Sequence, residues 1–214
     1  MTASRRALIL VGLIPTLLIT FAPIGLWGQA HLGVGPLAGR ELPYWALVVV
    51  LLLYVVLVER RPLASIGFRM PGIVDLLLAI AAGVLIVVAM SLAFLFLFPA
   101  LHLKGNTAMI ATILKTPFWY RFWLVTRAAV SEELLFRAYP IERIQELSGS
   151  RWIAALVSVV AFTYAHLAGW GAAQLIPVAF GAVVLAALYL WRRNLWANML
   201  AHWLADGAGF LLPH

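Results

Sequence analysis

Apolar runs close to the length of a bilayer crossing recur along the chain, and they constrain the fold more than any other feature. A helix needs about 20 consecutive apolar residues to cross the hydrocarbon core. A segment in lipid must satisfy its own backbone hydrogen bonds, and runs this long and this uniformly apolar do so as helices rather than as barrel strands. The sequence therefore predicts an all-α fold, a polytopic transmembrane helical bundle, in a single membrane domain of residues 1–214.

Composition supports the same interpretation, and about seven spans are expected. Hydrophobic residues make up 64% of the chain and charged residues 11%, whereas a soluble domain is nearer about 45–50% apolar and about 25% charged. The expected spans are Ala7–Trp27, Tyr44–Val58, Ile73–Phe98, a segment beginning near Phe118, Trp152–Leu167, Ala172–Trp191 and Leu195–Leu212.

Basic residues flank these runs, and they predict the orientation because cytoplasmic loops are enriched in Lys and Arg. Four basic clusters fall on one side of the membrane if the N-terminus is cytoplasmic, although Lys104, Lys115 and Arg121 depart from this pattern. The clusters are Arg5–Arg6, then Arg60, Arg61 and Arg69, then Arg143 and Arg151, and finally Arg192–Arg193. Flanking of this kind explains the net charge of +7, so nucleic acid is not expected as a partner.

An acidic pair lies inside an apolar segment, where ionisable residues are costly and usually face the bundle interior or a wet cavity. Glu133 and Arg137 are four residues apart, so they share a helix face and can form an ion pair. Glu132 points about 100° away, has no evident local partner, and is free for chemistry. Without the other motifs, the acidic pair fits a structural role equally well. In that role Glu133 and Arg137 form a salt bridge at the membrane border, and Glu132 is a solvated glutamate.

A histidine is predicted to lie at the same depth as Glu132. The expected turn between two antiparallel helices is Ser148–Ser150, and Glu132 lies 17 residues before Gly149 while His166 lies 17 after it. Equal distances from the turn correspond to equal depth at about 1.5 Å per residue. A lone His in an apolar helix is usually a hydrogen-bonded structural residue, but a His level with an unpaired Glu is a candidate for catalysis.

The last apolar run carries a polar stripe. Asn198, His202 and Asp206 follow one another at intervals of four, so they share one face of a helix. Such a stripe must face protein or water, and helix–helix hydrogen bonding is the simpler alternative to a functional site.

The absence of cysteine excludes disulfides and thiol catalysis.

Together these residues resemble the motifs of the CPBP intramembrane proteases, which include the type II CAAX prenyl endopeptidases and the bacteriocin-processing Abi-type proteins. The family motifs are Glu-Glu-x-x-x-Arg, Phe-x-x-x-His and His-x-x-x-Asn/Asp. They match Glu132-Glu133…Arg137, Phe162…His166 and His202…Asp206, and the resemblance covers a catalytic core of about residues 118–210. Each motif alone is weak, but three in order at fitting intervals are specific.

The resemblance implies an intramembrane endopeptidase that hydrolyses a membrane-proximal peptide bond. Glu132 and His166 would activate the attacking water, while His202 and Asp206 would stabilise the oxyanion or bind a metal. Glu133, Arg137 and Asn198 would support them. The cofactor is then either none or a divalent metal such as zinc, held by Glu132, His166, His202 and Asp206. These are acceptable N/O ligands, although a His-Glu-x-x-His helix is lacking. A metal-free, glutamate-based mechanism is slightly favoured.

Partners and location follow from this interpretation. The expected substrate is a membrane-anchored or membrane-proximal protein or peptide, and the expected location is a bacterial inner (cytoplasmic) membrane. Two alternatives remain open: a non-catalytic relative acting as an immunity or assembly factor, and a proton-coupled transporter that uses Glu and His as a relay. The transporter is disfavoured because no inverted repeat is evident.

Overall fold

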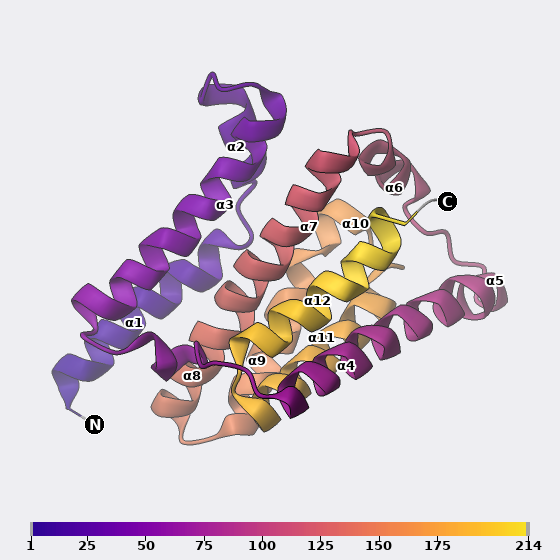
Figure 1. Cartoon of the computed structure of the whole chain (residues 1–214). Coiled ribbons are helices and arrows are strands. Elements are labelled where there is room, and N and C mark those ends of the chain that lie inside the picture. The colour runs from indigo at the N-terminus through magenta and orange to yellow at the C-terminus, as the bar shows by residue number, and fades with distance from the viewer. Residues whose placement is uncertain (1, 213–214) are drawn as a thin grey trace.

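A computed structural model describes residues 2–212, and within that range all regular secondary structure is helical (Figure 1). The predicted all-α bundle is therefore confirmed. The first half contains α1 (Ala3–Ile19), α2 (Ile24–His31), α3 (Pro36–Leu53) with the π-helical turn η1 (Tyr54–Val58), the 3₁₀ turn η2 (Leu63–Ile66), α4 (Ile73–Leu92), the π-helical turn η3 (Ala93–Leu97) and α5 (Phe98–Ala100). The second half contains α6 (Thr107–Leu114), α7 (Phe118–Glu132), the π-helical turn η4 (Glu133–Ala138), α8 (Tyr139–Ser148), α9 (Arg151–Ala165), α10 (Leu167–Trp170), α11 (Leu175–Arg192) and α12 (Leu195–Phe210).

The predicted number of about seven spans is not confirmed. Within residues 2–212, four helices are long and apolar enough to cross a membrane, or five if the bent pair α1 and α2 counts as one span. The four are Pro36–Val58, Ile73–Ala100, Arg151–Trp170 and Leu175–Arg192. The predicted fourth and seventh spans fall outside this set for physical reasons. α7 carries several charged residues close together, and α12 is only 16 residues long.

The first predicted span is not one straight helix. α1 ends at Ile19, and α2 starts after Pro23 with its axis turned by 74°. Pro23 has no backbone N–H and also disfavours helical geometry in the residue before it. The apolar run 7–27 is therefore divided into two helices, which a count of apolar residues does not reveal.

The helical hairpin that carries the acidic pair forms as predicted. α8 ends at Ser148, Gly149 follows with φ of +74°, and the Ser150 hydroxyl accepts a hydrogen bond from the backbone N–H of Ile153 at the start of α9. A positive φ is inexpensive only for glycine, so Gly149 permits the reversal. This turn places α7–α8 and α9 antiparallel to one another.

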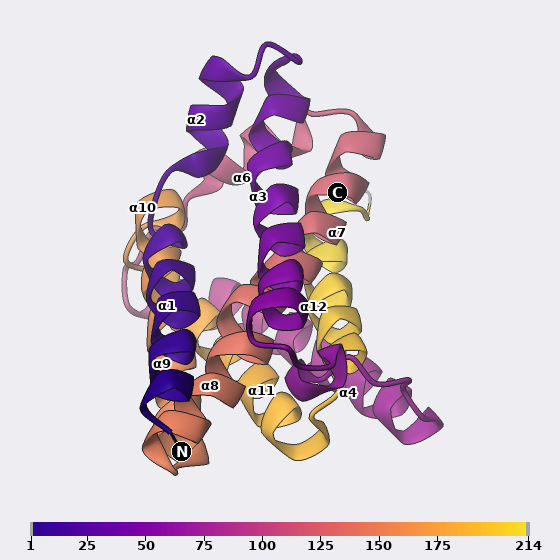
Figure 2. The same ribbon diagram turned by 90° about the vertical axis from the view of Figure 1, so that its left-hand side faces the viewer.

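The last helix lies between α4 and α7, as Figures 1 and 2 show. α4 approaches it closely because Gly83 has no side chain: a Cβ there would lie 3.0 Å from the carbonyl oxygen of Ala201. Small residues allow membrane helices to approach in this way. The close packing holds α12, with its polar stripe, against α7 in the interior of the bundle.

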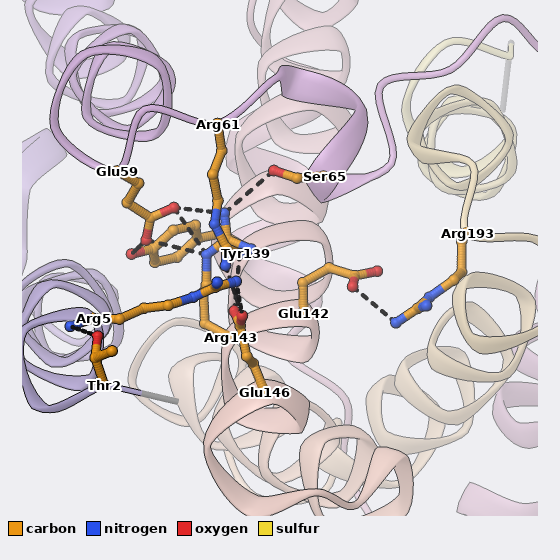
Figure 3. A network of polar contacts seen from close by, with 10 residues as sticks. All are labelled: Thr2, Arg5, Glu59, Arg61, Ser65, Tyr139, Glu142, Arg143, Glu146 and Arg193. Atoms are coloured by element: carbon orange, nitrogen blue, oxygen red, sulfur yellow. Dashed lines mark hydrogen bonds and ion pairs between the residues drawn. The ribbon is translucent and has the colours of Figure 1, made fainter.

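A network of ion pairs joins the helix ends at one side of the molecule (Figure 3). The pairs are Arg5–Glu146, Arg61–Glu146, Arg143–Glu59 and Arg193–Glu142. Each of the four basic clusters noted in the sequence contributes one arginine to this network. The clusters therefore share one end of the bundle, as a common side of the membrane requires.

Candidate active site

The acidic pair lies where an α-helix changes to a π-helical turn. Glu132 is the last residue of α7, and Glu133 begins η4. Pro140, just beyond this turn, has no N–H for the carbonyl group of Phe136 and would clash with it in a regular α-helix. The wider turn relieves that conflict, and such π-bulges occur frequently at functional sites.

Glu133 is the anchor of the site. It is fully buried, and its Oε1 accepts hydrogen bonds from Arg137 Nη1 at 3.0 Å and from His202 Nδ1 at 2.7 Å. Its Oε2 accepts a bond of 3.0 Å from Asn198 Nδ2, which also donates to the carbonyl oxygen of Leu185 at 2.8 Å. The predicted Glu133–Arg137 pair is present, and the polar stripe of α12 faces it.

Arg137 is held by an aromatic ring as well as by its carboxylate. Its guanidinium carbon lies 3.8 Å from the centre of the Phe162 ring, and the residue is fully buried. A desolvated cation over a ring face contributes about 2 kcal/mol. The same ring packs against the imidazole of His166, with 4.4 Å between ring centres. The Phe-x-x-x-His motif therefore links the buried arginine to a candidate catalytic histidine.

Glu132 and His166 face each other, as their equal distance from the turn predicts. Glu132 Oε2 lies 3.7 Å from His166 Nε2, and both side chains are about one-fifth exposed. The other ring nitrogen, Nδ1, lies 2.7 Å from the carbonyl oxygen of Phe162. A carbonyl only accepts, so Nδ1 carries the hydrogen and Nε2 of the neutral ring presents its lone pair to Glu132.

His202 joins the two glutamates. With Nδ1 bonded to Glu133, its Nε2 lies 3.9 Å from Glu132 Oε2 and 3.5 Å from Asp206 Oδ2. The side chain of Asp206 is the most open of the group, with 31% exposed. The structure thus brings all seven residues singled out in the sequence into one continuous cluster.

One expectation about Glu132 is wrong. It does have a local partner, because Arg127 Nη1 lies 3.5 Å from Glu132 Oε1. The spacing of five residues is outside the usual helical pairs, so the sequence pattern did not indicate it. Arg127 in turn pairs with Glu41 of α3. Both Arg127 and Glu41 are ionisable residues inside apolar runs, and this feature of the sequence could have indicated them as part of the site.

The polar cluster does not form an evident metal site. No group of three or more His, Cys, Asp or Glu side chains within residues 2–212 is arranged to hold a metal ion. The geometry therefore gives no support to a zinc set of Glu132, His166, His202 and Asp206. That ligand set stays a hypothesis, and chelation tests it.

An apolar cavity lies away from the polar cluster, in the described part of the molecule. A space of about 500 Å³ between α1 and α3 is lined mainly by apolar side chains, and Leu135 of η4 closes one part of it. Neither the acidic pair nor the histidines line it. This cavity is therefore separate from the cluster of carboxylates and imidazoles at the junction of α7, α9 and α12.

Several helices are apolar enough to span a bilayer, and they define the class: an integral membrane protein, here with a cluster of carboxylates and imidazoles among its helices. Residues 114–208 match the sequence model of the Type II CAAX prenyl endopeptidase Rce1-like family. The resemblance predicted from the three motifs is thereby confirmed over a segment that contains all seven site residues. The match is a similarity of this segment to that family. No curated protein and no solved structure matches the chain.

Proposed function

We propose that this protein is an intramembrane endopeptidase in which Glu132 and His166 activate the water that attacks a membrane-proximal peptide bond. The observation that carries the proposal is the separation of 3.7 Å between Glu132 Oε2 and His166 Nε2. That separation is too long for a direct hydrogen bond, and one water can contact both atoms at normal distances. General-base catalysis needs a base within hydrogen-bond reach of the attacking water, and a second acceptor can orient that water.

In this mechanism Glu132 takes the proton of the water as the oxygen attacks the carbonyl carbon. The lone pair of His166 Nε2 accepts the second hydrogen of the water and orients it. The protonated Glu132 then delivers the proton to the departing amine, as a base that becomes an acid. General acid–base catalysis of this kind contributes about 10²–10⁴-fold to the rate.

In the proposed mechanism, His202 stabilises the oxyanion. Glu133 accepts from its Nδ1 at 2.7 Å, and Asp206 Oδ2 lies 3.5 Å from its Nε2. In the imidazolium form both nitrogens donate, so Nε2 can bond to the developing oxyanion while Glu133 holds the ring. Asp206 balances the charge of the ring. Asn198 and Arg137 hold the Glu133 carboxylate in place through hydrogen bonds.

The substrate in this proposal is a membrane-anchored or membrane-proximal protein, and the location is a bacterial inner membrane with the N-terminus cytoplasmic. The shared end of the four basic clusters supports that orientation. The position of the centre among apolar helices supports cleavage close to the bilayer. A substrate of the CAAX type is consistent with the family of the matched segment.

The proposal is tested by cleavage in a reconstituted membrane. The purified chain is incubated in liposomes with peptides that end in a CAAX sequence, prenylated and unprenylated, and the products are identified by mass spectrometry. In parallel, membrane proteins are compared between cells that carry the wild-type chain and cells that carry Glu132→Gln. We expect fragments that depend on Glu132. Cleavage by neither approach would favour the non-catalytic or transporter alternatives.

Removing metal is expected to leave activity intact. We expect the enzyme to survive exhaustive chelation, and Asp206→Asn to keep measurable activity. The amide oxygen can still accept from His202, while its NH₂ group becomes a possible oxyanion donor. Purified enzyme is assayed with and without chelator while its metal content is measured. Activity that follows one bound metal per chain, and returns when metal is added, would refute this mechanism but not the protease function.

A further inference from the structure

A largely buried arginine connects the proposed general base to the N-terminal half of the chain. Arg127 of α7 is 12% exposed, and its Nε donates to Glu41 Oε2 of α3 at 2.7 Å. Its Nη1 lies 3.5 Å from Glu132 Oε1, and its guanidinium carbon lies 4.4 Å from the centre of the Tyr44 ring. The ion pair with Glu41 is thus the short one, and the contact with Glu132 is the long one.

Glu41 is itself held in place. It is 3% exposed, and its Oε1 accepts a hydrogen bond of 2.8 Å from the hydroxyl group of Tyr120. The Tyr120 hydroxyl and Arg127 therefore occupy different oxygens of the same carboxylate. The Glu41 carboxylate, held in this way, keeps the guanidinium of Arg127 near Glu132. Its negative charge also compensates the positive charge of Arg127.

The unequal contacts have a consequence for the proposed chemistry. A tight bidentate bond to Arg127 would occupy both oxygens of Glu132 and weaken it as a base. Here Arg127 contacts only Oε1, while Oε2 faces His166 and His202. The arginine can therefore orient the carboxylate while leaving the reactive oxygen free.

We infer that Arg127 is a positioning residue of the proposed reaction and that Glu41 of α3 holds it in place. The inference rests on the proposed function. It adds a contribution to the site from α3, which lies outside the matched residues 114–208. The competing explanation is a purely structural ion pair between α3 and α7.

A double-mutant cycle separates the two explanations. Arg127→Met or Glu41→Gln alone leaves one buried charge without its partner, so both are expected to lower Tm. The double variant Glu41→Gln/Arg127→Met removes both charges and is expected to regain most of the lost stability. Its kcat is nevertheless expected to stay about tenfold to a hundredfold below wild type, because Glu132 is no longer oriented. KM should be unchanged, since Arg127 does not face the peptide in this proposal.

The chain offers a matched control far from the base. Glu59, just after η1, pairs with Arg143 of α8 at 2.5 Å and accepts a hydrogen bond of 2.9 Å from the Tyr139 hydroxyl (Figure 3). This control pair repeats the Glu–Arg–Tyr arrangement and is at least as buried, with the Glu59 side chain 3% and the Arg143 side chain 1% exposed. Glu59→Gln/Arg143→Met is expected to regain both stability and kcat.

Arg127→Lys tests the inference a second way, because it keeps the charge and should fold. A lysine amine lacks the fork that reaches two carboxylates at once, so we expect a normal Tm, an unchanged KM and a reduced kcat. Normal kcat in both Arg127→Lys and the Glu41/Arg127 double variant would overturn the inference. Glu132→Gln is measured in the same assay. If that variant remains active, the proposed function fails instead.

Discussion

Glu132→Gln is expected to lower kcat/KM for peptide hydrolysis by at least about a hundredfold while leaving Tm nearly unchanged. The glutamine amide cannot take a proton from water. We expect little effect on the fold, because the polar contacts of this side chain with Arg127, His166 and His202 are all 3.5 Å or longer. Initial rates on a peptide substrate in liposomes, together with thermal unfolding in detergent, measure both quantities.

Glu142→Gln provides the control for this variant. Glu142 also lies on the α7–α8 helix and pairs with an arginine, Arg193, but it belongs to the network at the helix ends. It is expected to keep wild-type kcat. Near-full activity of Glu132→Gln, with loss of activity in Glu133→Gln at unchanged stability, would reverse the roles of the two glutamates.

Removing either partner of the Glu133–Arg137 pair is expected to destabilise the protein by about 3–5 kcal/mol, which is typical when one half of a buried ion pair is lost. Glu133→Gln leaves the charge of Arg137 uncompensated. Arg137→Ala leaves the charge of Glu133 uncompensated and also removes the packing on Phe162. Both variants should lose activity as well, because Glu133 orients His202. Thermal unfolding in detergent measures the loss.

A partly exposed ion pair provides the control for the stability effect of Glu133→Gln. Glu146 is 24% exposed and pairs with Arg61 at 2.6 Å at the polar end of the bundle. Exposed pairs contribute about 0–1 kcal/mol each, and Glu146 also pairs with Arg5. Glu146→Gln should therefore change stability by no more than about 2 kcal/mol. A Tm for Glu133→Gln equal to that of Glu146→Gln would show that Glu133 is not the structural anchor.

The sequence predicts the local and periodic features of this molecule well. Uniformly apolar runs have one way to satisfy their backbone hydrogen bonds in lipid, so an all-helical bundle follows from composition and run length. The turn at Gly149 follows from its place between two helices, and the level positions of Glu132 and His166 follow from equal distances to that turn. The stripe of Asn198 and His202 follows from a spacing of four.

The number of spans is harder to predict from the sequence, because the length of an apolar run does not show where a helix bends or how many charges it carries. Pro23 divides the first apolar run into two helices with a bend of 74°. The helix that carries Glu132 also carries Arg121 and Arg127, so it lacks the uniformly apolar composition of a simple membrane span. Such segments remain in the bundle because neighbouring helices supply partners for their polar groups.

Sequence by itself thus determined the helices, the hairpin and which polar side chains share a face, because these depend on backbone geometry and on spacings of a few residues. Only the tertiary structure decided which oxygen meets which donor: Glu133 with Asn198 and His202 of α12, and Arg127 with Glu41 of α3. Those pairings join residues 65 to 86 positions apart. They depend on how whole helices pack against one another, which no short-range pattern encodes.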